Sequence, residues 1–448
     1  MKLSKKILLS FTLCLIMSPV LADQKSFQET EVKAHQGNLI AQYNLGVMYA
    51  KGQGVAQSYA KAIEWYSKAA DQGDTVSQIV VGSMYYHGED IPQNYSKAFE
   101  WYSKAAQQGD AEAQYNIGLM YENAQGILKD DMKAFEWYSK AADQGYVEAQ
   151  YNLGGMYKNG EGIPQNYSKA FEWYSKAANQ GDVSAQNNLG GMYKNGEGIP
   201  QNYSKAFEWY SKAADQGHTI SQRNLGLMYK SGQGVSQNYA KAFELLNKAA
   251  IQGNEKGAQY TLGQMYYMGQ GVVKNYTKAF EWLSKAANQD SKEAQNAIAL
   301  MYYTGNGVPQ NYAKAFEWYS KAADQGYLSA QHSLGVMYDD GKGIPQNYGK
   351  AFEWYSKAAN QGYAESQNNL ANMYANGLGT SKNIALANKW YLESANNGDD
   401  FAQLNIGKNY LKGDNGMPVN YSQAKVWLRK AATNGNAEAK LILSGLKE

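Results

Sequence analysis

Residues 149–181 read AQYNLGGMYKNGEGIPQNYSKAFEWYSKAANQG, and variants of this stretch fill most of the chain. Tryptophan marks its spacing: it recurs every 36 or 37 residues from Trp65 to Trp427, and Leu245 takes the sixth of the eleven places. A repeat of this length is typical of stacked helical hairpins, in which each unit packs only on its neighbours. The sequence therefore predicts an all-α solenoid of about eleven antiparallel helix pairs.

The first half of the repeat has the apolar spacing of a helix. Ala149, Leu153, Met156 and Tyr157 lie at i, i+4, i+7 and i+8, which is one helical face. Gly154 lies at the edge of that face, and glycine recurs at this place in most units. Because glycine inside a helix costs about 1 kcal/mol relative to alanine, its recurrence predicts close packing between helices.

The second half of the repeat predicts another helix. Residues 160–164, GEGIP, break the chain, Asn166 is a candidate N-cap, and Gly181 is placed to end the helix. Glu172 precedes Lys176 by four residues, a spacing that favours an ion pair on the outer face and that nine units repeat. The apolar stripe consists of Tyr167, Ala170, Phe171, Tyr174, Ala177 and Ala178, with Trp173 at its border.

The AQYNLG stretch, the G-x-G-[VI] loop and the KAxEWYxKAAxQG helix resemble the Sel-1-like repeat family, a relative of the tetratricopeptide repeats. The resemblance implies a right-handed superhelix of antiparallel helix pairs, used mostly to assemble or recognise proteins. We expect eleven repeats in residues 38–436. Residues 23–37 and 437–448 are expected to form capping helices at the two ends.

The first 22 residues have the pattern of a bacterial export signal. Three lysines precede an apolar run over residues 7–17, and Val20-Leu21-Ala22 provides a small-residue cleavage site near Ala22. The run is too short to span a bilayer, so we expect a periplasmic or secreted protein without a transmembrane segment. Cys14 is the only cysteine, and the mature chain must therefore be held by packing alone.

The charge balance excludes some classes of partner. The formal net charge is +2, and it falls to −1 for residues 23–448 because the three signal lysines are lost. This argues against a nucleic-acid binder or a polybasic membrane binder. We expect a monomer that binds a protein or peptide ligand.

No residue pattern predicts catalysis, a cofactor or a metal site. The four histidines occupy different places in the repeat and lack the spacing of metal ligands; they are His35, His87, His218 and His332. Two Ser-x-x-Lys matches, at Ser58 and Ser422, lack the companion motifs of penicillin-binding enzymes. A cysteine-rich branch of the resembling family is linked to penicillin binding, but its paired cysteines are absent here.

The candidate binding face is the side of each first helix opposite its apolar stripe. Counted from the first alanine of a unit, positions +2, +6 and +9 lie within about 60° of one another. They vary between units while the core positions hardly change, which is typical of a concave peptide groove but also of neutral surface drift. The candidates are Tyr43, Tyr86, Tyr115, Tyr151, Lys158, Lys194, Arg223, Lys230, Tyr260, Tyr267, Tyr303 and His332.

Lys158, Lys194 and Lys230, with Arg223 nearby, predict a basic centre of this face that binds carboxylates or phosphates. Solvated lysines are the alternative, since residues 153–178 and 189–214 are identical and some side chains are duplicated copies. The sequence thus favours an exported, non-enzymatic interaction scaffold of the bacterial cell envelope, with its ligand on the concave face. An envelope enzyme acting on β-lactams or peptidoglycan through Ser58, and a passive structural spacer, are the alternatives.

Overall fold

The structure is a computed structural model that describes residues 24–88 and 91–446. The described residues form 24 α-helices and contain no strand. This confirms the predicted all-α fold of paired helices. The predicted signal peptide, residues 1–22, lies outside the described residues.

The helices come in pairs along the chain, one pair to each repeat. The first helices of the pairs are α2 (Leu39–Lys51), α4 (Thr75–His87), α6 (Ala111–Glu122), α8 (Val147–Asn159), α10 (Val183–Asn195), α12 (Thr219–Ser231), α14 (Lys256–Met268), α16 (Lys292–Thr304), α18 (Leu328–Asp340), α20 (Ala364–Asn376) and α22 (Asp400–Lys412). The second helices are α3 (Tyr59–Asp71), α5 (Tyr95–Gln107), α7 (Asp131–Asp143), α9 (Tyr167–Asn179), α11 (Tyr203–Asp215), α13 (Tyr239–Gln252), α15 (Tyr276–Ala287), α17 (Tyr312–Asp324), α19 (Tyr348–Ala359), α21 (Ile384–Asn396) and α23 (Tyr421–Thr433). The helix α1 (Gln24–His35) precedes them, η2 (Asp414–Gly416) lies in the last loop, and α24 (Ala437–Gly445) follows.

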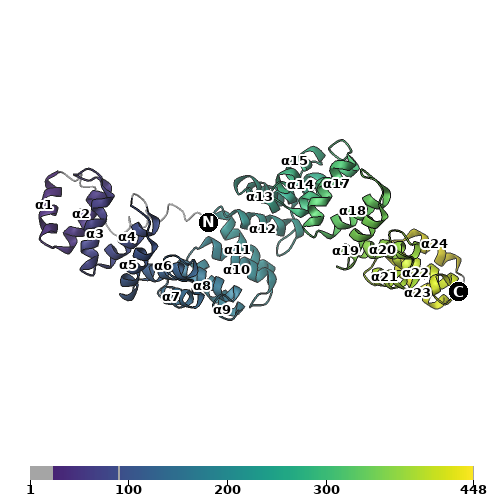
Figure 1. Cartoon of the computed structure of the whole chain (residues 1–448), viewed down its shortest axis with the longest axis horizontal. Helices are drawn as coiled ribbons and strands as arrows, with labels where there is room; N and C mark the ends of the chain where they lie inside the picture. The colour runs from purple at the N-terminus through teal and green to yellow at the C-terminus, as the bar shows by residue number, and fades with distance from the viewer. Residues whose placement is uncertain (1–23, 89–90, 447–448) are drawn as a thin grey trace. The chain divides into compact units, whose positions relative to one another are not determined.

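The chain divides into two compact units, residues 1–216 and 217–448. The first contains α1–α11 and the second α12–α24. Within each unit every helix packs on the helices before and after it in the chain, so that the pairs follow one another in sequence order (Figure 1). This nearest-neighbour packing is the arrangement that the repeat predicts.

The helix ends are defined by the predicted capping residues. The Asn166 side-chain oxygen accepts a hydrogen bond from the Lys169 backbone N–H at 3.0 Å, which satisfies one free donor of α9. Gly160 ends α8 in the left-handed region, with φ +76°, and its N–H donates to the Met156 carbonyl. Gly181 follows α9 with φ +98°, a conformation that favours glycine.

The recurrent glycine of the first helix is explained by close packing on the second helix. A Cβ atom added to Gly154 would lie 2.8 Å from Cδ1 of Tyr174, closer than side-chain carbons approach one another. The same contact occurs at Gly46, Gly82, Gly118, Gly190 and Gly335, each against the tyrosine of its own unit. The predicted close approach of the paired helices is therefore confirmed.

A column of buried glutamines joins each unit to the next, and the sequence analysis missed its role. Gln150 is 4% exposed, and its side-chain amide donates to the Ala142 carbonyl at 3.1 Å. Its oxygen accepts from the Gln180 side chain at 2.8 Å, and Gln180 also donates to the Gly145 carbonyl. Buried polar groups are nearly always hydrogen-bonded. Glutamine occupies this place in all eleven repeats, and this recurrence is the sequence signal from which the hydrogen-bonded column could have been predicted.

The outer face of the second helices differs from the prediction. Of the nine Glu–Lys pairs, only Glu64–Lys68 and Glu244–Lys248 lie within ion-pair distance, both at 2.8 Å. In the other seven the lysine Nζ lies 3.6–4.2 Å from the centroid of a tryptophan ring, as Lys176 does over Trp173. The predicted ion pair is wrong at these seven places, where the lysine instead lies over the tryptophan ring three residues before it, a favourable cation–π contact. Lys68 makes both contacts, one with Glu64 and one with Trp65.

Candidate functional site

All twelve predicted binding residues lie on first helices, and all are partly buried. Six of them belong to the unit of residues 1–216: Tyr43, Tyr86, Tyr115, Tyr151, Lys158 and Lys194. The other six belong to the unit of residues 217–448. Partial burial means that each of these side chains also contacts neighbouring residues of the same chain.

The tyrosines at position +2 lie against the second helix of their own unit. The Tyr151 ring centroid is 5.7 Å from that of Tyr174, and Tyr115 makes a similar contact with Tyr138. Burial raises the pKa of Tyr151 above its usual value and raises the pKa of Tyr260 to about 12. These hydroxyls are therefore protonated at neutral pH and can donate hydrogen bonds.

In four units the side chain at position +9 contacts the loop of the following unit, 39 residues later. In each of these four units the partner is the residue between the two glycine places of the G-x-G loop. The contacts are Tyr86 with Gln125 at 2.7 Å, Lys158 with Glu197 at 3.5 Å, Tyr267 with Asn306 at 2.9 Å, and Tyr303 with Lys342 at 3.0 Å. Each pair is chemically complementary, and this matching within one chain is a signal that the sequence analysis did not use.

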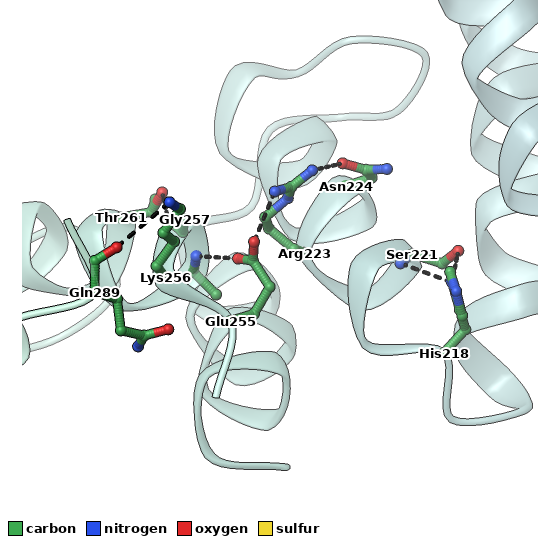
Figure 2. A network of polar contacts seen from close by, with 10 residues as sticks. His218, Ser221, Arg223, Asn224, Glu255, Lys256, Gly257, Thr261 and Gln289 are labelled. Atoms are coloured by element: carbon green, nitrogen blue, oxygen red, sulfur yellow. Dashed lines mark hydrogen bonds and ion pairs between the residues drawn. The ribbon is translucent and has the colours of Figure 1, made fainter. Parts of the chain in front are cut away.

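The predicted basic centre carries less free charge than its lysines suggest. Glu197 neutralises Lys158, and Glu255 neutralises Arg223 at 2.8 Å. Figure 2 shows Glu255 directed towards Arg223, whose guanidinium also donates to the Asn224 side chain at 3.1 Å. Glu255 precedes α14 and caps it by accepting from the Ala258 N–H, so this carboxylate also stabilises the start of the helix.

Lys230 and His332 are both affected by burial. Half-burial lowers the pKa of Lys230. Burial also lowers the pKa of His332, although Glu365 opposes the shift. Nδ1 of His332 lies 3.0 Å from the Ser366 hydroxyl, and its ring packs on Tyr363. His332 therefore lies in a contact between helices α18 and α20 rather than projecting freely.

Two of the twelve residues, Tyr151 and Lys158, line a common pocket. It has a volume of about 400 Å³ and is formed by α6, α8, α9, α10 and the loop after α8. Its other lining residues include Glu122, Glu161, Tyr174 and Asn188. A second pocket of about 440 Å³, between α21, α22 and α23, contains none of the predicted residues.

The polar and charged side chains that line this pocket can form hydrogen bonds and ion pairs with a ligand. In the described part of the chain, no group of three or more His, Cys, Asp or Glu residues is arranged to hold a metal ion. No helix there is long and apolar enough to cross a membrane.

Ser58, the one serine considered as a nucleophile, is the N-cap of α3 and accepts from the Lys61 N–H at 3.4 Å. The geometry around it is that of a helix cap.

Comparison with known families identifies the repeat. The family model described as Sel1 repeat matches residues 39–74, 75–110, 111–146, 147–182, 183–218, 219–254, 257–291, 292–327, 328–363, 364–399 and 400–436. The chain belongs to the Sel1 repeat family. Sel1 repeat proteins generally mediate protein–protein interactions, and no catalytic family is indicated.

Two solved structures of Sel1 repeat proteins are similar over most of their length. One is c5321, a protective antigen present in uropathogenic Escherichia coli strains, with 36% identity, 94% coverage of this chain, 91% of that chain and a TM-score of 0.81. The other is a Sel1 repeat protein from Oxalobacter formigenes, with 31% identity, 78% and 90% coverage and a TM-score of 0.50. A search of curated proteins found no match.

Proposed function

We propose that this Sel1 repeat protein is an exported, non-enzymatic scaffold of the bacterial cell envelope that binds a protein or peptide on the face formed by its first helices. The pocket that Tyr151 and Lys158 share carries the proposal, because it is a hollow on the predicted face with aromatic, amide and charged groups around it. Such mixed linings are used for specific recognition. The twelve predicted residues remain our candidates for this face.

Export is supported by the composition of residues 1–22, with its lysines, apolar run and Val20-Leu21-Ala22 end. The similar Escherichia coli protein is a protective antigen, which also supports a location outside the cytoplasm. Cell fractionation and N-terminal sequencing test this part of the proposal. We expect a mature N-terminus at Asp23; an intact Met1 on a cytoplasmic protein would contradict it.

Binding is tested by cross-linking and mass spectrometry of partners captured by the full chain from envelope and host-fluid extracts. The informative variant is Tyr151→Asn combined with Lys158→Gln, because asparagine occupies the place of Tyr151 in the next unit, at Asn187. The control is Glu172→Gln, an exposed position on α9. We expect the double variant to lose a partner that the control retains.

Equal recovery of every partner by the double variant and the control would refute the role of this face and would favour a passive spacer. The enzymatic alternative predicts β-lactam turnover or muropeptide release by the purified protein, abolished by Ser58→Ala. The N-cap geometry of Ser58 gives that alternative no support.

A further inference from the structure

The pocket beside Tyr151 contains an electrostatic mismatch in an otherwise regular pattern. In four units the side chain at position +9 meets a complementary loop residue 39 positions later. Glu122 also occupies position +9, and the loop residue 39 positions later is Glu161. Both line the pocket, so two carboxylates stand where the other units place matched partners.

In the described residues, no ion pair joins either of these two carboxylates to a basic side chain. The ion-pair partner of Lys158, the one cation lining the pocket, is Glu197, which belongs to the next loop. Glu122 accepts a hydrogen bond from the Tyr138 hydroxyl, and Glu161 accepts one from the Asn159 amide at 3.0 Å. These neutral donors orient the carboxylates but leave their charges in place.

The repeat fold does not require this arrangement. When both positions are moved one repeat along the chain, by 36 residues, Lys158 takes the place of Glu122, and Glu197 takes the place of Glu161. That pair is complementary and lies at 3.5 Å. Three other places of the pattern in the described residues pair no two like charges: Lys194 with Gln233, Lys230 with Gln270 (40 positions later, across a one-residue insertion), and Asp339 with Leu378. The Glu122–Glu161 pair is therefore specific to this pocket.

We infer that the pocket accepts an arginine or lysine side chain of the bound protein. This inference rests on the proposed function and names the chemistry of its partner. A guanidinium carries several hydrogen-bond donors, and its charge-assisted hydrogen bonds to carboxylates are stronger than hydrogen bonds between neutral groups. The ring of Tyr151, which is partly exposed and also lines the pocket, offers an aromatic surface for a cation. The pocket volume of about 400 Å³ accommodates such a side chain with part of its backbone.

The experiment begins with a random dodecapeptide display library selected on the full chain. We expect the recovered peptides to be enriched in arginine or lysine. The strongest binder is then measured by fluorescence polarisation, both as selected and with its basic residue replaced by citrulline or norleucine, which have a similar shape without the charge.

The variant is Glu122→Gln/Glu161→Gln, since glutamine oxygens can still accept the bonds from Tyr138 and Asn159. The control is Glu172→Gln/Glu208→Gln, which removes two exposed carboxylates from outer faces. We expect the pocket variant to bind at least about tenfold more weakly and the control to bind unchanged. The neutral peptide should show the same loss on the wild-type protein and no additional loss on the pocket variant.

Peptides without basic residues, or equal affinity for the wild-type protein and the pocket variant, would overturn the inference. If the selected peptides nevertheless bind more weakly to the Tyr151→Asn/Lys158→Gln variant than to the wild-type protein, the proposed function stands although the inference about a basic side chain fails. A library that yields no specific peptide would count against both.

Discussion

Replacing Gly154 by alanine tests the close packing between the paired helices. A Cβ atom at this position would lie 2.8 and 2.9 Å from Cδ1 and Cε1 of Tyr174. Overpacking of this kind typically costs about 1–3 kcal/mol. The substitution also improves helix propensity by about 1 kcal/mol, which conceals part of that cost.

The adjacent glycine provides a matched control. A Cβ atom at Gly155 would meet only the Tyr174 hydroxyl, at 3.6 Å, which is an ordinary contact. Gly155→Ala therefore gains the same helix propensity without the clash, and we expect it to stabilise the protein by up to about 1 kcal/mol. The difference in unfolding free energy between the two variants isolates the overpacking, and we expect about 1–3 kcal/mol.

The assay is urea unfolding followed by circular dichroism, with hydrogen exchange to locate the change in α8 and α9. Gly190→Ala and Gly191→Ala repeat the comparison in the duplicated unit, where the corresponding distances are 2.8 and 3.6 Å. Ala299 lies in the same core cluster as Tyr319, so one methyl group at this place can be accommodated when the helices adjust. The reasoning is refuted if Gly154→Ala is as stable as Gly155→Ala.

Two further predictions concern residues 217–448. Trp318 packs on two successive core clusters, so Trp318→Ala should cost on the order of 3 kcal/mol. Hydrogen exchange should then accelerate first in α16–α18, whereas uniform acceleration along the chain would contradict nearest-neighbour stacking. For His332, burial holds the pKa in the folded state below the ordinary value of 6.5, so the unfolded state takes up its proton first as the pH falls. The stabilisation that depends on neutral His332 is present at higher pH and is lost as the pH drops through that window. His332→Asn, with the residue found at Asn296 and Asn368, should therefore make thermal stability less sensitive to acid; identical pH profiles of the two proteins would disprove this.

The sequence by itself determined the period, the helix pairs, the caps at Asn166 and Gly181, and the close approach at Gly154. These features depend on helical geometry and backbone sterics within one unit, which short stretches of sequence encode. It also placed all twelve candidates on the first helices, because their positions follow from the same periodicity.

Only the tertiary structure decided which partner each polar side chain takes. Lys176 had both Glu172 and Trp173 within reach along one helix, and the packed conformation places it over the ring. Lys158 is neutralised by Glu197, and Glu122 faces the same pocket as Glu161, although each pair is 39 residues apart. Such contacts depend on the rotation and spacing between successive units, which periodicity within one helix does not specify. The lysines in the sequence therefore predict a basic centre, whereas packing pairs Lys158 with Glu197 and brings Glu122 and Glu161 into the same pocket.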